Sequence, residues 1–248
     1  IPLEAMVERE PVTIILSKRG WIRAMRGHID GAARAKLAFK EGDELAHILP
    51  AQTTDRILIA AANGRVYTLA ADKLPGGRGF GEPVRLMVDI EGEGDIIALT
   101  SASVTSKMLV ASSSGHGFVV ATSGLIAETR KGKQIVNLKS GARLSTLRAI
   151  SEGDDMVAVV GDNRKLLIFP LTDLPEMGRG QGVMLQKYKD GGLADVRTIR
   201  LADGLSWTMG GAEARTRNES DLGEWQGARA SAGRMAPVGF PRNNQFGS

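Results

Sequence analysis

The chain repeats one segment, in which a short apolar run, a Leu-Pro break, a basic glycine loop and a second apolar run follow each other. The clearest copy covers residues 165–185, and an earlier copy covers residues 65–84. A looser copy lies between them, at residues 118–136. A segment that recurs in this way indicates a fold built from repeated units that pack against their neighbours.

Pairs of apolar runs around a glycine or asparagine form a second pattern, which is typical of β-hairpins. The pairs are 12–16 with 21–25, 56–60 with 66–69, 108–110 with 118–120, 156–160 with 166–169 and, more weakly, 205–209 with 212–214. The turn residues Gly20, Gly64, Gly115, Asn163 and Gly210 are spaced 44, 51, 48 and 47 residues apart. Glycine and asparagine suit tight hairpins because both tolerate a positive φ.

A second glycine series supports the same period. Gly42, Gly94, Gly141 and Gly191, at spacings of 52, 47 and 50, each precede a further apolar run. Together the two series predict five units of four strands, starting near residues 10, 45, 96, 144 and 195. Four strands at this period are typical of a propeller blade. The first unit lacks a strand before Val12, so a closed ring needs a strand from one terminus. The only segment that could turn helically is short, at residues 30–39.

Composition excludes several classes of protein. The chain has 248 residues, 42% of them hydrophobic, and no cysteine, so disulfides and thiolate metal sites are excluded and a reducing cytoplasm fits. No apolar run reaches the roughly 18–20 residues of a membrane span, and no signal peptide is recognisable. We expect a piece of a longer polypeptide, since the first residue is Ile1. The net charge of +4 and the pI near 9.5 are compatible with a polyanionic partner.

No catalytic or metal-binding constellation is recognisable. His28, His47 and His116 lack the spacing of metal ligands, and Tyr67 and Tyr188 lie in or beside repeat strands, where packing explains them. The glycine loops precede extended runs at residues 84–86 and 183–185 rather than helices, which argues against a nucleotide cradle. We therefore expect no active site, no metal and no cofactor in this chain.

Cations recur on and around the glycine loops, whereas acids gather in other turns, near residues 41–44, 89–95 and 152–155. A single loop of this kind is most simply explained as a connection between two blades whose arginine is solvated. Because the loop recurs, we favour a functional interpretation, in which backbone amides and cations of the loops approach DNA phosphates closely. The candidate DNA contacts are Lys18, Arg19, Arg23, Arg26, Arg78, Arg130, Lys131, Lys133, Arg179, Lys187 and Arg229.

Three segments carry a resemblance to a known family. They are residues 21–31 (WIRAMRGHIDG), residues 74–83 (LPGGRGFGEP) and residues 169–175 (FPLTDLP). With the repeats laid out, the chain resembles the C-terminal domain of the A subunit of bacterial type IIA topoisomerases, from residue 10 to about residue 235. Topoisomerase IV is a better match than gyrase, because residues 28–36 (HIDGAARAK) do not form the Gln-Arg-Arg-Gly-Gly-Lys-Gly box of gyrase. Residues 178–182 are only a degenerate match to that box.

The resemblance implies an all-β, five-bladed β-pinwheel, a propeller variant whose blades exchange strands and whose basic edge bends duplex DNA. It divides the chain into a linker (1–9), the pinwheel (10–236) and a C-terminal tail (237–248). The implied function is non-sequence-specific DNA binding that directs crossings to the cleavage core for decatenation and relaxation of supercoils in chromosome segregation. The cleaving tyrosine belongs to the preceding domain, so this part is non-catalytic.

The resemblance further implies a whole enzyme that is an A2B2 heterotetramer with the B subunit of topoisomerase IV, in the bacterial cytoplasm at the nucleoid. ATP and Mg belong to the core and to that partner. Three alternatives stay open at this point. One is a gyrase domain with a degenerate box, another is a protein-interaction β-propeller, and the third is an enzyme built on a propeller, against which the missing catalytic cluster counts.

Overall fold

The computed structural model describes residues 7–92, 94–209 and 215–247, and their regular secondary structure is almost entirely antiparallel sheet. The chain divides into two compact units. Unit 1 consists of residues 1–106 and 122–134, and unit 2 of residues 107–121 and 135–248.

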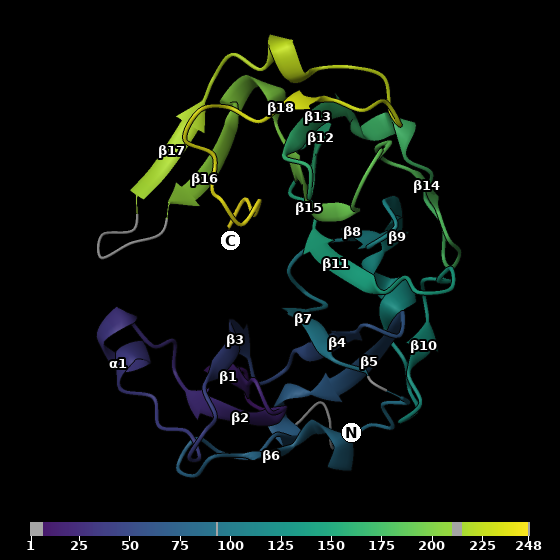
Figure 1. Cartoon of the computed structure of the whole chain (residues 1–248). Coiled ribbons are helices and arrows are strands. Elements are labelled where there is room, and N and C mark those ends of the chain that lie inside the picture. The colour runs from purple at the N-terminus through teal and green to yellow at the C-terminus, as the bar shows by residue number, and fades with distance from the viewer. Residues whose placement is uncertain (1–6, 93, 210–214, 248) are drawn as a thin grey trace. The chain divides into compact units, whose positions relative to one another are not determined.

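Unit 1 contains two four-stranded sheets (Figure 1). The first has the order β3-β1-β2-β6, with β1 at Pro11–Ser17, β2 at Trp21–Arg26, β3 at Leu45–Gln52 and β6 at Glu82–Pro83. The second has the order β10-β5-β4-β7, with β4 at Arg56–Ala61, β5 at Arg65–Ala70, β7 at Ile96–Ser101 and β10 at Lys133–Gln134.

Unit 2 contains two more sheets of the same kind and a hairpin. One sheet, β11-β8-β9-β14, comprises β8 (Lys107–Ser112), β9 (His116–Ala121), β11 (Leu144–Ala149) and β14 (Val183–Met184). The other, β15-β12-β13-β18, comprises β12 (Met156–Gly161), β13 (Lys165–Pro170), β15 (Leu193–Ile199) and β18 (Arg234–Met235). The hairpin pairs β16 (Leu205–Met209) with β17 (Arg215–Glu219).

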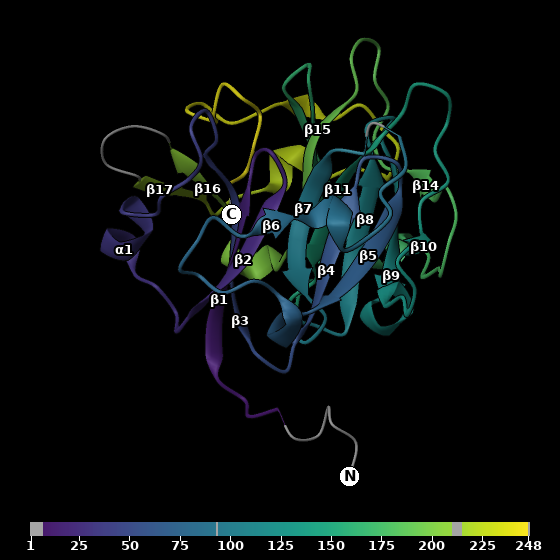
Figure 2. The same ribbon diagram turned by 90° about the horizontal axis from the view of Figure 1, so that it is seen from below.

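Helices are few and short. The single α-helix of the described residues, α1 (Gly31–Ala35), is capped by Asp30, whose carboxylate accepts a hydrogen bond from Ala33 N, and it stands away from β1–β3 in both ribbon views (Figures 1 and 2). The 3-10 turns are η2 (Ala71–Lys73), η3 (Val84–Leu86), η4 (Thr122–Leu125), η5 (Leu171–Asp173), η6 (Leu201–Asp203) and η7 (Gly223–Trp225). The prediction that Val84–Leu86 is extended is therefore wrong, because the strand ends at Pro83.

Four of the predicted hairpins are confirmed, as β1–β2, β4–β5, β8–β9 and β12–β13. Gly20, Gly64 and Gly115 end the turns with φ of 86, 88 and 84°. In the fourth hairpin the positive φ, 66°, falls on Arg164 rather than on Asn163. Asn163 instead accepts a hydrogen bond from Lys165 N at 3.0 Å through its side chain. In the fifth hairpin, Gly210 and residues 212–214 lie outside the described residues.

The strands that follow the second glycine series were predicted to open the next unit, and this is wrong. β3 pairs with β1 of the hairpin before it, with Ile15 opposite Ile48, and β7, β11 and β15 pair in the same way with β4, β8 and β12. The fourth strand of each sheet is the two-residue strand β6, β10, β14 or β18, which arrives from beyond the next hairpin. This exchange of strands confirms the predicted pinwheel class, with four four-stranded sheets and one hairpin in the described residues.

Apolar residues on alternate strand positions form the core between facing sheets. In unit 1, Ile14 and Ile22 of the first sheet pack with Ile57 and Tyr67 of the second, all of them fully buried. In unit 2 a corresponding cluster joins the sheets through residues such as Leu109 and Val157. A closely packed core of this kind fixes the sheets of a unit against each other and therefore positions their edges.

Residues 237–247, predicted to be a tail, pack against the last sheet and the hairpin. Phe240 and Phe246 are buried, and Phe240 contacts Trp207 edge-on with ring centroids 5.5 Å apart. Arg164 holds the segment by donating to the carbonyl of Pro241 at 2.8 Å. On the other side, Thr208 N donates to Phe246 O at 3.2 Å, so the segment lies beside β16.

Candidate nucleic-acid interface

Four loops of equivalent structure close the four-stranded sheets, and we call them closing loops 1 to 4. They comprise residues 76–83, 127–134, 177–184 and 228–235. Each ends in one of the two-residue strands β6, β10, β14 and β18 at an edge of its sheet. The basic glycine loops recognised in the sequence are the first three of these.

A glycine with a positive φ fixes the path of each closing loop. Gly81, Gly132, Gly182 and Gly233 have φ of 84, 64, 83 and 80°. They lie 51, 50 and 51 residues apart. A Cβ atom at Gly132 would stand 2.5 Å from the carbonyl oxygen of Val66, and at the other three positions it would stand closer still to the equivalent carbonyl. The backbone of each loop therefore lies directly on the neighbouring strand, which only glycine permits.

Backbone hydrogen bonds join each closing loop to the segment that follows the preceding one. Asp89 N donates to Arg130 O at 2.8 Å, Asn137 N to Gly180 O at 2.9 Å, and Lys187 N to Ser231 O at 3.1 Å. The three acceptors occupy the same place in their loops, two residues before the fixed glycine. Consecutive sheet edges within a unit are thus tied together rather than presented as independent loops.

Three of the predicted DNA contacts also hold these loops in place. Arg130 donates to Leu86 O at 3.0 Å and pairs with Asp89 at 3.3 Å. Arg179 donates to the side chain of Asn137 at 3.1 Å. Arg229 donates to Met184 O at 2.8 Å. Each of these arginines reaches toward the preceding loop, so its removal affects loop geometry as well as charge.

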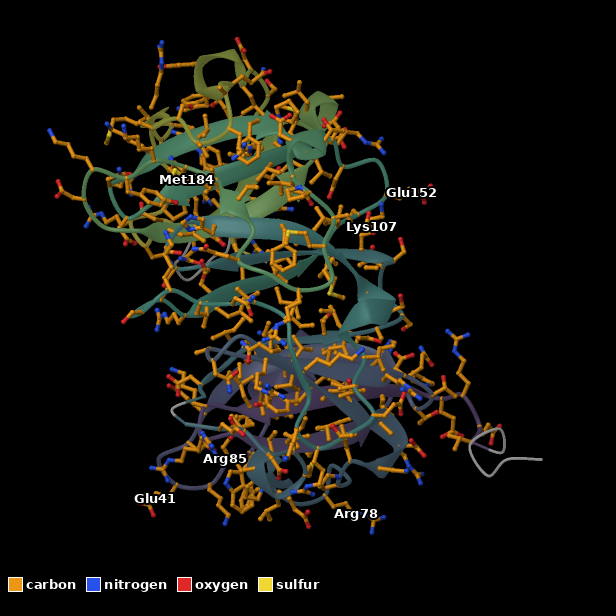
Figure 3. The ribbon with its side chains drawn as sticks, turned by 90° about the vertical axis from the view of Figure 1, so that its right-hand side faces the viewer. Glu41, Arg78, Arg85, Lys107, Glu152 and Met184 are labelled. Carbon is orange, nitrogen blue, oxygen red and sulfur yellow. The ribbon has the colours of Figure 1, made fainter. Side chains whose placement is uncertain are left out.

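Exposed cations on or next to the closing loops include Arg78, which points away from the ribbon in Figure 3, and Lys131 and Lys133. Lys187 follows closing loop 3 and is also exposed. Lys133 Nζ lies 3.4 Å from Gly124 O, a long contact. Among the described residues these four side chains form no ion pair, so they can reach a phosphate without breaking one there.

The first hairpin contributes three further exposed cations beside closing loop 1. Lys18 and Arg19 lie in its turn, next to the end of the loop, because Val84 N donates to Gly20 O at 2.8 Å. Lys18 is ion-paired with Glu44. Arg26 ends β2, on the side where the loop begins, since Ala24 forms a bridge with Gly76.

Arg23 does not belong to the interface, which corrects the prediction from the sequence. Its side chain is buried, with Nη1 donating to Gly79 O at 2.7 Å and Nη2 to Ala38 O at 2.6 Å. Burial lowers the pKa of its guanidinium below the ordinary arginine value. Arg23 thus helps to hold closing loop 1 in place through Gly79. Both of its terminal nitrogens already have acceptors within the protein.

Sequence reasoning missed two features of the interface. Closing loop 4 was not recognised as a copy, because residues 230–232, just before Gly233, lack the cation that the other three loops carry there, although the glycine spacing of about 50 residues identifies it. Its exposed cation is Arg234. Arg65 was also missed. It holds closing loop 2 by donating from Nε and Nη2 to Lys131 O at 2.9 and 2.6 Å.

Other kinds of site are not evident among the described residues. No group of three or more His, Asp and Glu side chains could hold a metal there, and no helix there is long and apolar enough to cross a membrane. His28 bonds to Ala51 O at 2.9 Å and His116 to Ser114 Oγ at 3.0 Å, so both have local structural partners.

Known proteins are similar to this chain in sequence. The A subunit of DNA topoisomerase 4 from Caulobacter vibrioides is 44% identical over 244 residues, covering 98% of this chain and 31% of the relative. The corresponding protein of Rickettsia bellii is 42% identical, covering 99% of this chain and 32% of the relative. The chain thus spans about a third of the length of these relatives.

Two solved structures have the same fold. The Escherichia coli ParC C-terminal domain matches with a TM-score of 0.79 and 26% identity, covering 94% of this chain and 96% of that one. A DNA gyrase A C-terminal domain matches with a TM-score of 0.66 and 16% identity, covering 90% of this chain and 76% of that one. The family model described as "DNA gyrase C-terminal domain, beta-propeller" matches residues 55–103, 107–151 and 155–203. Since these residues are more than half of the chain, and since the resemblance noted in the sequence points the same way, the chain belongs to this family.

Proposed function

We propose that the chain binds duplex DNA without sequence preference through its closing loops, as the C-terminal domain of a topoisomerase IV A subunit. The observation that carries the proposal is the repetition of one fixed backbone turn at the edge of four sheets, with cations on or beside every copy. The names of the two relatives, both of them A subunits of DNA topoisomerase 4, support the same function.

The chemistry of the closing loops suits phosphates rather than bases. Exposed lysines and arginines release counterions from DNA when they approach its phosphates, which favours binding independently of sequence. Reading bases in the major groove requires an element that enters it, usually a helix. The only α-helix in the described residues has five residues and lies outside the closing loops. Phosphate contacts of this kind position a duplex without specifying its sequence.

Two consecutive closing loops in one unit give a duplex successive points of attachment along linked sheet edges. A duplex that follows such edges bends, and smooth bending of a short site by 40–90° costs about 1–6 kcal/mol. Several phosphate contacts must therefore act together. The hydrogen bonds between consecutive loops support this, because they keep the contact points at a fixed spacing.

In the whole enzyme, we propose that this domain directs DNA crossings to the cleavage core for decatenation and relaxation of supercoils in chromosome segregation. The proposed division of the chain keeps the linker at 1–9 and the pinwheel at 10–236, and the segment that was predicted to be a tail at 237–248 packs on the pinwheel through residues 237–247. The proposed partner is the B subunit of topoisomerase IV in an A2B2 assembly at the bacterial nucleoid, with ATP and Mg bound elsewhere. Because residues 28–36 differ from the gyrase box, the intact enzyme should relax supercoils and never drive a relaxed plasmid to negative supercoiling.

The direct test titrates this chain against linear duplexes of several sequences at several salt concentrations. We expect similar affinities for all sequences, and a plot of log affinity against log salt that falls by about 0.9 per phosphate neutralised. A slope near zero, or binding confined to one sequence, would contradict the proposal. ATP-driven negative supercoiling by the intact enzyme would instead assign the chain to a gyrase.

A further inference from the structure

The exposed apolar side chains of this protein concentrate at the closing loops. In the described residues, the large apolar side chains with high exposure are Phe80, Leu86, Val104, Met184, Met235 and Val238. All except Val104 lie within a closing loop or within the five residues after its fixed glycine. Exposed apolar residues scattered singly need no explanation, but their concentration on one kind of element does.

These side chains also recur at equivalent positions. Met184 and Met235, 43 and 58% exposed, both stand two residues after the fixed glycine, as the last residues of β14 and β18. Leu86 and Val238, 64 and 98% exposed, both stand five residues after it. Closing loop 2, which carries three cations, has no such side chain, whereas each of the other three closing loops carries both cationic charge and an exposed apolar side chain.

The two methionines are presented on a fixed backbone. Arg229 Nη1 donates to Met184 O at 2.8 Å, and Trp225 Nε1 donates to Met235 O at 2.9 Å. Both strands are also paired in the sheet, Met184 opposite His116 and Met235 opposite Lys165. With the backbone held on both sides, the long thioether side chains are directed to the surface of unit 2, where Figure 3 places Met184 on the side opposite Glu152.

Cations lie close to each methionine along the chain. Lys187 follows Met184 by three residues, Arg234 directly precedes Met235, and Arg229 contacts the first of them. The core of a protein–protein interface is depleted of charge and apolar over a continuous area. Here single exposed apolar side chains share their loops with cations, in three of the four closing loops. That arrangement matches duplex DNA, in which apolar sugar and base surfaces in the minor groove lie between two lines of phosphates.

We propose that Met184 and Met235 contact the minor groove of bound duplex DNA, adding an apolar, salt-independent part to the affinity and favouring bending of the duplex over unit 2. The inference rests on the proposed function. Apolar side chains placed between base steps partly unstack them and kink the duplex, which provides a physical route from these contacts to bending. The flexible methionine side chain suits a surface that must accept any sequence.

The test replaces both residues, Met184→Ala with Met235→Ala, and measures affinity for a 30-base-pair duplex across a salt series and bending by energy transfer between dyes on its ends. We expect affinity to fall about tenfold at every salt concentration, as loss of two apolar contacts implies. The salt slope should stay unchanged and the bend should decrease. Val104→Ala, which removes exposed apolar surface outside the closing loops, should change neither affinity nor bending.

Two other results are distinguishable. A double variant that binds and bends DNA like the wild type, while the wild type keeps a steep salt slope, would overturn the inference and assign the methionines to a protein contact. A wild-type chain that fails to bind linear duplex DNA would overturn the proposed function itself. Equal melting temperatures of the wild type and the double variant would show that the affinity change does not arise from unfolding.

Discussion

Closing loops 2 and 4 share one backbone and differ in chemistry. Gly132 and Gly233 both take a positive φ and lie on the carbonyl of a β-strand, at Val66 and Leu166. Around them, closing loop 2 presents Lys131 and Lys133, whereas closing loop 4 presents small residues, one exposed cation (Arg234) and an exposed methionine. Glycine and its contacts therefore fix the turn, and the flanking side chains are free to vary between copies.

The backbone turn that closing loops 2 and 4 share predicts the largest effect, a loss of stability when its glycine is replaced. Gly132→Ala and Gly233→Ala should each lower the free energy of unfolding by about 3 kcal/mol, because a Cβ atom would collide with a carbonyl at a φ that alanine disfavours. The control is Gly178→Ala, whose Cβ would meet nothing within 4 Å. Urea denaturation of the three variants measures the difference. An equal loss at all three positions, or at none, would mean that these turns are not fixed by glycine.

The different number of cations on closing loops 2 and 4 predicts the next largest effect, which is on the salt dependence of DNA binding. Lys131→Gln with Lys133→Gln should reduce the salt slope by about 1.8, and Arg234→Gln in closing loop 4 by about 0.9. Stability should hardly change, since these side chains are exposed. Lys107→Gln is the control for net charge, because Figure 3 places Lys107 on the side of unit 2 away from Met184, and it also removes the ion pair of Lys107 with Glu176. If the control variant lowers the salt slope as much as the loop variants do, the change reflects the net charge of the protein rather than contacts at the closing loops.

The hydrogen bonds between loops predict a smaller effect on stability. Arg130→Ala and Arg229→Ala should each cost about 1 kcal/mol, since each removes a bond to a backbone carbonyl, at Leu86 or Met184. Thermal melts measure this loss. Arg78→Ala, which removes an exposed arginine from closing loop 1, should leave the melting temperature unchanged. If Arg130→Ala behaves like Arg78→Ala, the contact to Leu86 does not support the loop.

The smallest effect concerns pH. Burial lowers the pKa of His47 below its ordinary value, so the unfolded chain takes up a proton on this side chain at a higher pH than the folded protein does. Stability is therefore fully present above about pH 6.5 and is lost as the pH falls through the lowered value. His47→Gln should flatten this dependence in denaturation experiments. DNA affinity should not follow it, because closing loops 2 and 4 contain no histidine.

The sequence predicts the hairpins well, because two glycine series report the same period independently. It does not show which neighbour the strand at Leu45–Gln52 pairs with, since an apolar run of this kind can extend the sheet before it or the sheet after it. The positive φ of Arg164 could not be predicted from the sequence for another reason. Its positive φ is compensated by bonds to Pro241 and other residues of the C-terminal segment, far away in sequence.

For the interface, the sequence identifies cations but not their surroundings. Arg23 and Arg26 belong to the same basic segment, so the sequence makes both of them candidates for a DNA contact. Arg23 is nevertheless buried, because strand alternation turns its side chain inward, where it donates to the carbonyls of Gly79 and Ala38. The role of Arg130 in holding a loop depends on Asp89, which follows the preceding closing loop. Contacts of this kind depend on the exchange of strands and become visible only once the sheets are assembled.

The most direct test of DNA binding at the closing loops uses the absence of native cysteine in this chain. Single variants Lys133→Cys, Met235→Cys and Glu152→Cys can each carry an attached reagent that cleaves nearby DNA. We expect cleavage of a bound duplex from positions 133 and 235, and none from position 152, which lies on the side of unit 2 opposite Met184 (Figure 3). Cleavage from position 152 with none from the two closing loops would contradict it.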